Sequence, residues 1–530
     1  MSLKKQTLFL GTMAAIGMTI LLAGCGGKTA AASSSAEAGT KSAGPGVKEF
    51  TVLTMRWGDM GDSFAQNQWL KNLESQTGVK ITWQVVSSSD WNEQKSIMLA
   101  GGGLPDIIFG NMTFNDSDII NNIEYFIALD DLIDQYMPNY KKAMTAIPAF
   151  RMITTFPDGK IYSLAKNLPS RPKACNQPVI NKKWLDNLGL PVPATLDELT
   201  AALRAFKEQD ANGNGDPTDE IPVSFGRDYT SDLLNPFSIN SYWNPTNGIC
   251  SINGAFVFYE TSDNYKAGLK WLNLLYREGI LDAEAFTQDD QMLNGKRQSP
   301  NASRIGFDYQ WSSDAVFGKW SDEYIVIPPI KGPDGKAYAF GQTTGVHSIQ
   351  RNEALITTAC KDPATAAAWI DHFYESEASI QNFWGPIGTV ITKHSDGTYT
   401  LNDPPAGVSA DAWYWDQSLR DFGPKYIEPG FSDHIKLNST VGDGLKLEAA
   451  KLANDIVTDP YPAVIHTAAE TSELATLSAD IFGYTAQMRA KWVTQDGIDA
   501  DWDTYIAQLK RMGLDRYMEI KMTAYNRMVK

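Results

Sequence analysis

The sequence contains few cysteines and few histidines, and neither residue type forms a recognisable motif. Only 4 cysteines occur in 530 residues. Cys175, Cys250 and Cys360 lie far apart in the sequence. Because three cysteines cannot pair completely, we predict buried free thiols and neither a disulfide scaffold nor a zinc site. The 5 histidines are scattered without the spacing of metal ligands.

Positive charge is also scarce. Lysine and arginine number 46 against 62 aspartate and glutamate residues, which gives a formal net charge of −16. Nucleic-acid binding needs clustered basic residues, so we expect no nucleic-acid partner. The sequence also lacks a "GxSxG" elbow and a phosphate-binding loop, and "AGGGLPD" leads into a strand rather than a helix. The absence of these motifs argues against a serine hydrolase and against a nucleotide-binding enzyme.

Long apolar runs are missing except near the N-terminus. There, an apolar run follows Lys4 and Lys5 and ends in "LAGC" at Cys25. This pattern is typical of a secretory signal peptide, and the final cysteine makes it resemble the lipobox of bacterial lipoproteins. The resemblance implies that residues 1–25 are a lipoprotein signal peptide and that Cys25 is lipidated. An uncleaved membrane anchor is the alternative, but the run is shorter than the roughly 20 residues that span a bilayer.

Residues 26–47 are small and polar without periodicity, which predicts a flexible tether. The body of the protein is therefore expected at the extracellular face of the cytoplasmic membrane, as a lipid-anchored monomer. The rest of the chain exceeds the size of one hydrophobic core, which favours at least two lobes.

After the tether, the sequence alternates between strand and helix patterns. "EFTVLTMRW", "VKITWQVV" and "DIIFG" are typical of buried strands, and helices are predicted between them at 64–77 and 90–100. Such a βαβαβ segment builds a parallel sheet, and ligands bind beyond the carboxyl ends of its strands. These ends carry Trp57, Asp59 and Asn111, which are the first candidates for a ligand-binding wall.

Four sequence blocks follow the lipobox in an informative order. They are "AGGGLPDIIFGN", "INKKWLDNLGLPVPATLDELTAALRAFKEQDANGNGDPTDEIP", "ATAAAWIDHFY" and "DWDTYIAQLKRMGLDRYMEIKMTAYNRM". Together they resemble the lipoprotein-type extracellular solute-binding proteins of family 1, the carbohydrate-binding receptors of ATP-binding-cassette (ABC) importers in Gram-positive bacteria. The resemblance implies an α/β, two-lobed periplasmic-binding-protein-like fold of type II, whose lobes are joined by crossing hinge segments.

On this basis, the N-lobe is predicted to comprise residues 48–170 and 340–405, and the C-lobe residues 171–339 and 406–530. We predict a non-catalytic receptor that captures a carbohydrate, expected to be an oligosaccharide, and delivers it to the permease subunits of an ABC transporter. A secreted glycoside-active enzyme with paired carboxylates is the alternative, because aspartate and glutamate are numerous. A sensor component or a peptide receptor is a third possibility, because a fold does not name its ligand.

The stretch "DANGNGDPTDE" places oxygen-bearing side chains at alternate positions with glycines between them. This pattern suits calcium, which takes about six to eight oxygen ligands at loose geometry. Ile221 stands where an EF-hand has a bidentate glutamate, so we predict a structural calcium site at 210–220 rather than a sensor. The family resemblance implies that the loop closes with an acidic pair, and a metal-free Asx-rich turn is the alternative. The predicted ligands are Asp210, Asn212, Asn214, Asp216, Asp219 and Glu220.

Sugars present apolar C–H faces edged with hydroxyl groups, so a sugar site needs aromatic surfaces and polar partners. Several of the 15 tryptophans and 21 tyrosines lie beside polar residues in loop-like sequence. Core packing is the alternative for each, and it is expected for Trp184, Trp271, Trp369 and Trp502, which fall on helical stripes. In "WGPIGT", Pro386 stands where the family often has an acidic residue. The candidate ligand-binding residues are Trp57, Asp59, Asn111, Trp243, Tyr309, Trp311, Trp384 and Trp415.

Overall fold

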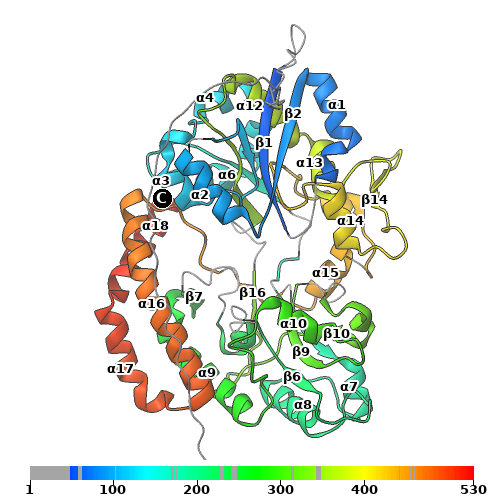
Figure 1. The fold of residues 1–530 in the computed structure, drawn as a ribbon, viewed down its shortest axis with the longest axis vertical. Helices are drawn as coiled ribbons and strands as arrows, with labels where there is room; N and C mark the ends of the chain where they lie inside the picture. The colour runs from blue at the N-terminus through cyan, green and yellow to red at the C-terminus, as the bar shows by residue number, and fades with distance from the viewer. Residues whose placement is uncertain are drawn as a thin grey trace, which may run out of the picture. The chain divides into compact units, whose positions relative to one another are not determined.

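Two β-sheets organise the chain, one in each lobe of the folded unit Gly46–Lys530 (Figure 1). Each sheet has its own hydrophobic core. The computed structural model describes residues 48–57, 62–101, 103–168, 172–174, 176–226, 232–239, 248–311, 316–341, 348–440, 442–453, 455–458 and 460–530. In this part of the chain, no helix combines the length and the apolar character needed to span a bilayer.

The N-lobe sheet has five strands in the order β2-β1-β3-β12-β4. The first three strands are parallel, and β12 pairs antiparallel with β3 and with β4. The predicted βαβαβ segment is therefore present at the start of the lobe. The strands are β1 (Lys48–Arg56), β2 (Val79–Ser87), β3 (Ile107–Phe109), β4 (Leu164–Asn167) and β12 (Ile349–Ile356).

Helices cover this sheet through apolar faces, as Figure 1 shows for α1 beside β2. The first helix begins at Gln68 rather than at Phe64, and it ends at Thr77, where it is capped by Gly78 with a left-handed φ of 68°. The helices of the lobe are α1 (Gln68–Thr77), α2 (Trp91–Gly101), α3 (Asp116–Asn121), α4 (Asp130–Tyr136), α5 (Pro138–Ala146), α6 (Ala149–Thr154), α12 (Pro363–Asp371), α13 (Ser376–Trp384) and α14 (Ala410–Gln417).

The segment from 406 to 440 packs in the N-lobe, which differs from the predicted division at 405/406. Trp415 and Phe422 belong to a core with Leu53 and Ile108 of the N-lobe sheet. A small sheet also joins the segment to the preceding chain, because β15 pairs in parallel with β14. These aromatic side chains find their apolar neighbours on strands that are distant in sequence. The small sheet consists of β13 (Ile391–Lys393), β14 (Tyr399–Leu401) and β15 (Ile435–Lys436).

The C-lobe sheet has four strands in the order β10-β5-β9-β6. Its first strand, β5, enters α7 directly, and β9 forms the centre of the sheet together with β5. A separate hairpin lies in the same lobe. The strands are β5 (Gln177–Asn181), β6 (Ile221–Val223), β9 (Ile305–Gln310), β10 (Tyr324–Val326), and β7 (Ile249–Ile252) with β8 (Ala255–Phe258) in the hairpin.

Helix α8 shows why the C-lobe helices form where they do. Thr195 and Glu198 make the reciprocal capping box predicted from the sequence, and Leu199 and Phe206 of the same helix face the core. The long helix α16 packs on α9 and α18 (Figure 1). The helices are α7 (Lys182–Asn187), α8 (Leu196–Glu208), α9 (Asp263–Arg277), α10 (Asp290–Arg297), α16 (Ala468–Gln495), α17 (Ile498–Arg511) and α18 (Leu514–Met528).

The chain passes between the lobes after β4, before β12, and again through a segment that contains α15 (Gly442–Ala450). In this third segment, β16 (Val457–Thr458) pairs with β11 (Ala339–Phe340) of the second crossing. Cys360 is a free, buried thiol, as predicted, and Cys250 is also buried, whereas Cys175 lies outside the described residues.

Candidate functional site

The carboxyl ends of β1 and β3 lie at one edge of the N-lobe sheet, because the two strands pair in parallel. Trp57 follows β1 and is 39% exposed, with its ring centre 6.2 Å from that of Phe422. Asn111 follows β3 and is half-buried, and its neighbour Met112 is 41% exposed. Trp57 and Asn111 therefore leave the sheet at the same edge, whereas Asp59 lies outside the described residues.

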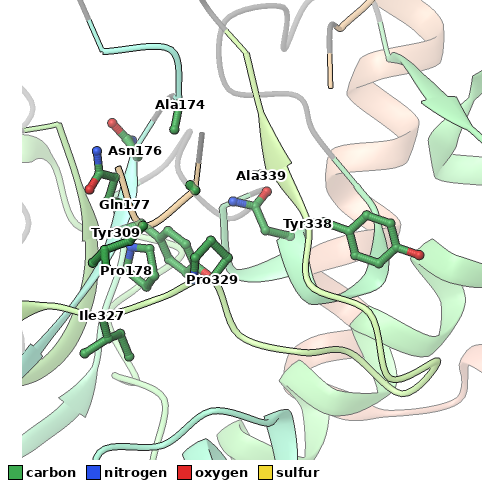
Figure 2. A pocket seen from close by; sticks show the side chains of 12 residues that line it. Ala174, Asn176, Gln177, Pro178, Tyr309, Ile327, Pro329, Tyr338 and Ala339 are labelled. Atoms are coloured by element: carbon green, nitrogen blue, oxygen red, sulfur yellow. The ribbon is translucent and has the colours of Figure 1, made fainter. Parts of the chain in front are cut away.

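The end of β9 supplies two aromatic candidates in the C-lobe. Trp311 is half-buried, and the Nζ atom of Lys446 lies 6.0 Å from the centre of its ring. Tyr309 is only 7% exposed and lines a small pocket (Figure 2). Trp243 is in a stretch that the structure does not describe.

The pocket lies between the C-lobe sheet and the turn that follows α15. Asn176 and Gln177 are on its sheet side, near Tyr309, as Figure 2 shows, and Leu452 and Ala453 come from the turn. Its volume of about 10 Å³ suits a single water molecule. In this conformation the pocket is therefore too small for a sugar ring.

Asn176, which lines the pocket, forms a buried polar pair with Asp232. The Nδ2 atom of Asn176 donates a hydrogen bond of 2.8 Å to Oδ2 of Asp232, the first residue of a short helix at Asp232–Phe237. The Oδ1 atom of Asn176 is buried, with no hydrogen-bond partner within the described part of the chain. Burial raises the pKa of Asp232 to about 7, and the nearby Asp308 adds to the rise. Near neutral pH, the pair can therefore offer both a carboxyl proton and an amide oxygen to a hydroxyl group.

Trp384 and Trp415, two of the predicted ligand-binding residues, are buried in the structure. Trp384 is 0% exposed, and its Nε1 atom donates a hydrogen bond of 2.9 Å to Oδ2 of Asp443. Trp415 is 9% exposed, and its ring packs edge-on against Phe422 and beside the guanidinium of Arg56. In this structure, each indole is therefore already packed against, or hydrogen-bonded to, other residues of the chain.

The loop 210–220 joins α8 to β6 and is closed by hydrogen bonds among its own residues. Asp210 accepts from the backbone N–H groups of Asn214 and Gly215, at 3.1 and 2.8 Å. Asp219 accepts from the side-chain amides of Asn212 and Asn214, at 2.7 and 3.0 Å. Gly215 has a φ of 91°, which the tight turn requires. Four of the predicted ligands are thus tied into one turn.

Glu220 has an incomplete set of hydrogen bonds in this loop. It is 3% exposed, and its Oε1 atom accepts from the N–H of Asn212 at 3.2 Å. Its Oε2 atom is buried and makes no hydrogen bond to the described residues. Burial raises the pKa of Glu220, and Asp219 and Asp210 contribute to the rise. Because a buried carboxylate oxygen needs a donor or a cation, Glu220 fits a metal ligand.

Asp216 is exposed and accepts hydrogen bonds from Thr218, from Oγ1 at 2.6 Å and from the backbone N–H at 3.0 Å. Among the described residues, no three aspartate, glutamate, histidine or cysteine side chains are grouped as a metal site. An ion in the loop would therefore also need oxygens from asparagine side chains or the backbone, which calcium accepts.

Sequence reasoning missed three residues of this region, namely Asn176, Asp232 and Lys446. Asn176 precedes a buried strand, and Asp232 begins a short helix, so neither position has a distinctive local pattern. Lys446 lies on a short helix whose sequence reads as surface, yet it is 4% exposed. Only the tertiary fold brings these polar groups beside Tyr309 and Trp311.

Comparison with known proteins places the chain among solute-binding proteins. A family model described as bacterial extracellular solute-binding protein matches residues 57–380. The fructooligosaccharide ABC transporter substrate-binding protein FusA of Streptococcus pneumoniae is 32% identical over 478 residues, which is 86% of each chain. These relatives are substrate-binding proteins of transporters, so the alternative of a glycoside-active enzyme has no support from them.

Solved structures agree with the two-lobed α/β fold predicted from the sequence. Two structures of FusA of S. pneumoniae are similar to this chain: FusA in complex with kestose, and an EF-hand mutant of FusA in complex with fructo-nystose. Each gives a TM-score of 0.77 at 28% identity and covers 91% of this chain and 99% of FusA. The HMO-binding, ABC-transporter-associated solute-binding protein of Bifidobacterium longum infantis gives a TM-score of 0.76 at 27% identity, with the same coverage of 91% and 99%.

Proposed function

Because this chain belongs to the bacterial extracellular solute-binding protein family, we propose that it captures an oligosaccharide between its lobes and delivers it to the permease subunits of an ABC importer. One observation carries this proposal: each lobe presents a partly exposed indole at a strand end, Trp57 after β1 and Trp311 after β9. Flat aromatic faces on two opposed lobes suit the apolar faces of sugar rings.

A short fructose-containing oligosaccharide is our first candidate ligand, since FusA is named for fructooligosaccharides. In this proposal, Trp57 and Trp311 stack on sugar rings, and Asn111 and the Asn176–Asp232 pair bind hydroxyl groups. The ligand contacts both lobes only when they close, so binding shifts the population toward the closed form. The permease then recognises that form, and the sugar is released unaltered.

We also propose that the loop 210–220 holds a structural calcium ion. The Oε2 atom of Glu220, which has no hydrogen-bond partner among the described residues, supports this proposal, as does the EF-hand variant in a FusA structure. Asp210, Asn212, Asn214 and Asp219 would supply further oxygens. The ion would balance the negative charge of the buried Glu220 and fix the end of α8 to β6. Asp216 is exposed and is therefore the weakest candidate ligand.

The remaining part of the proposal concerns the location of the protein. Cys25 would carry the lipid, and residues 26–47 would hold the folded unit away from the outer face of the cytoplasmic membrane, as a monomer. The family description as extracellular agrees with this location. Metabolic labelling of the expressed protein with a fatty-acid analogue, compared with Cys25→Ala, tests the anchor.

The function is tested by adding kestose and a panel of other oligosaccharides to the purified protein. We expect saturable changes in tryptophan emission, a smaller radius of gyration in X-ray scattering, and no new reducing ends over several hours. Release of reducing ends without saturable binding would contradict a receptor and favour an enzyme.

A further inference from the structure

Residues 463–465, which follow the third crossing between the lobes and precede α16, lie at the boundary between two hydrophobic cores. Val464 is 5% exposed and belongs to the C-lobe core together with Phe307 of β9. Its neighbour Ile465 is 7% exposed and belongs to an N-lobe core together with Ile108 of β3. Two consecutive side chains are therefore buried in different lobes.

An arginine of the N-lobe binds the backbone of this segment. Arg351 lies on β12 and is 8% exposed, and its Nη1 atom donates a hydrogen bond of 3.1 Å to the carbonyl oxygen of Ala463. Its Nε atom donates to Oδ1 of Asp116, the first residue of α3, at 2.8 Å, and its Nη2 atom binds the other carboxylate oxygen. Because this two-point ion pair fixes the guanidinium plane, Arg351 holds the Ala463 carbonyl from a rigid position.

An arginine of the C-lobe makes the equivalent set of contacts. Arg527 lies in the last turn of α18, and its Nη2 atom donates a hydrogen bond of 3.1 Å to the carbonyl oxygen of Ile465. The same guanidinium binds both carboxylate oxygens of Glu470, in the first turn of α16, at 3.0 and 2.7 Å. Two carbonyl groups of one short segment are thus held by two arginines, one from each lobe.

We propose that residues 463–465 are a pivot for the movement between the lobes, with Arg351 and Arg527 as its two clamps. Pulling Val464 or Ile465 out of its core would expose apolar surface, and separating Arg351 from Asp116 would leave a buried charge unpaired. The movement that keeps these contacts is a rotation taken up by the backbone dihedrals between the two clamps.

The clamps narrow the range of orientations that the lobes adopt before any ligand binds. A narrower range keeps a larger fraction of the protein close to the orientation that binds ligand, which improves the apparent affinity. This effect on affinity rests on the proposed function, whereas the pivot itself does not.

The test measures the distance between spin labels on the two lobes by double electron–electron resonance, in protein without ligand. The labels are attached at two exposed helical positions, through Lys71→Cys in α1 and Asp197→Cys in α8. Cys25→Ser and Cys175→Ser remove other sites of labelling. The width of the distance distribution then reports how far the lobes move relative to each other.

Arg527→Met removes one clamp and should widen this distribution. It should also weaken the binding of kestose by about threefold to tenfold, because less of the protein is in the orientation that binds. Arg516→Met is the matched control: Arg516 is also on α18 and forms a two-point ion pair with Glu473 of α16, at 2.8 and 2.9 Å, but it donates no hydrogen bond to residues 463–465. The control should keep the wild-type width and affinity.

Ile465→Ala is a second variant, which removes the apolar anchor in the N-lobe and leaves both ion pairs in place. It should also widen the distribution, and it decides the question if Arg527→Met does not fold. A distribution for Arg527→Met as narrow as that for Arg516→Met would overturn the pivot, as would a wild-type width for Ile465→Ala. Wild-type protein that binds no oligosaccharide would overturn the proposed function alone, because the distances are measured without ligand.

Discussion

Replacing Glu220 by glutamine tests the calcium loop most sharply. Glu220 is 3% exposed, with one carboxylate oxygen lacking a partner among the residues that the structure describes. With calcium at a hundred times its dissociation constant, the native state gains about 2.7 kcal/mol. A lobe of this size shifts by about 2 to 4 °C per kcal/mol, so the melting temperature should rise by roughly 5 to 11 °C.

The assay is thermal unfolding in excess calcium and in a chelator, for the wild type, Glu220→Gln and Glu208→Gln. Glu208 is exposed at the end of the helix that leads into the loop, so its variant should keep the calcium response of the wild type. Glu220→Gln should lose most of that response. A wild-type protein whose melting temperature is the same in calcium and in chelator would refute this reasoning.

The pH dependence without calcium follows from the same carboxyl group. Burial raises the pKa of Glu220 in the folded state, so the folded protein holds this proton at a pH where the unfolded chain has released it. Stability in chelator should therefore fall as the pH rises from the ordinary pKa through the raised one. Glu220→Gln should remove that fall, whereas equal pH profiles for both proteins would contradict the assignment.

Three further predictions concern stability and reactivity. Burial raises the pKa of Asp232 from 3.8 to about 7, so the stability of the wild type should fall as the pH rises from 3.8 to 7. The Asp232→Asn variant should therefore have a higher melting temperature than the wild type at pH 8 but not below pH 4. An equal difference in melting temperature at both pH values would contradict this reasoning. Thr195→Ala removes a capping box and should cost about 1 kcal/mol, or a few degrees in thermal unfolding, and an unchanged melting curve would argue against the cap. Burial raises the pKa of Cys360 to about 11, so mass spectrometry after maleimide treatment should find this thiol modified only in the unfolded protein.

Local patterns in the sequence predicted much of the fold. The buried strand β1 and the capped helix α8 depend on residues within a few positions of one another, so periodicity and caps were sufficient. The same holds for Trp184 and Trp369, whose helical stripes correctly predicted burial.

The site was harder to predict, because burial there depends on distant partners. Trp384 looks like a loop tryptophan in sequence, yet its indole N–H binds Asp443, 59 residues further along the chain. Lys446 looks like a surface lysine but is enclosed beside Asp411 and Trp311. No local pattern encodes such contacts, since they arise only when the chain crosses between the lobes.

The central claim is that indoles from both lobes grip an oligosaccharide, and calorimetric titration of kestose into three variants tests it most directly. Trp57→Ala and Trp311→Leu should each weaken binding at least about tenfold, equivalent to about 1.4 kcal/mol. Trp320→Leu alters another half-buried C-lobe indole, whose N–H binds Ser299 at 2.7 Å, and it should leave the affinity unchanged. Wild-type affinity in both the Trp57 and Trp311 variants would contradict the account.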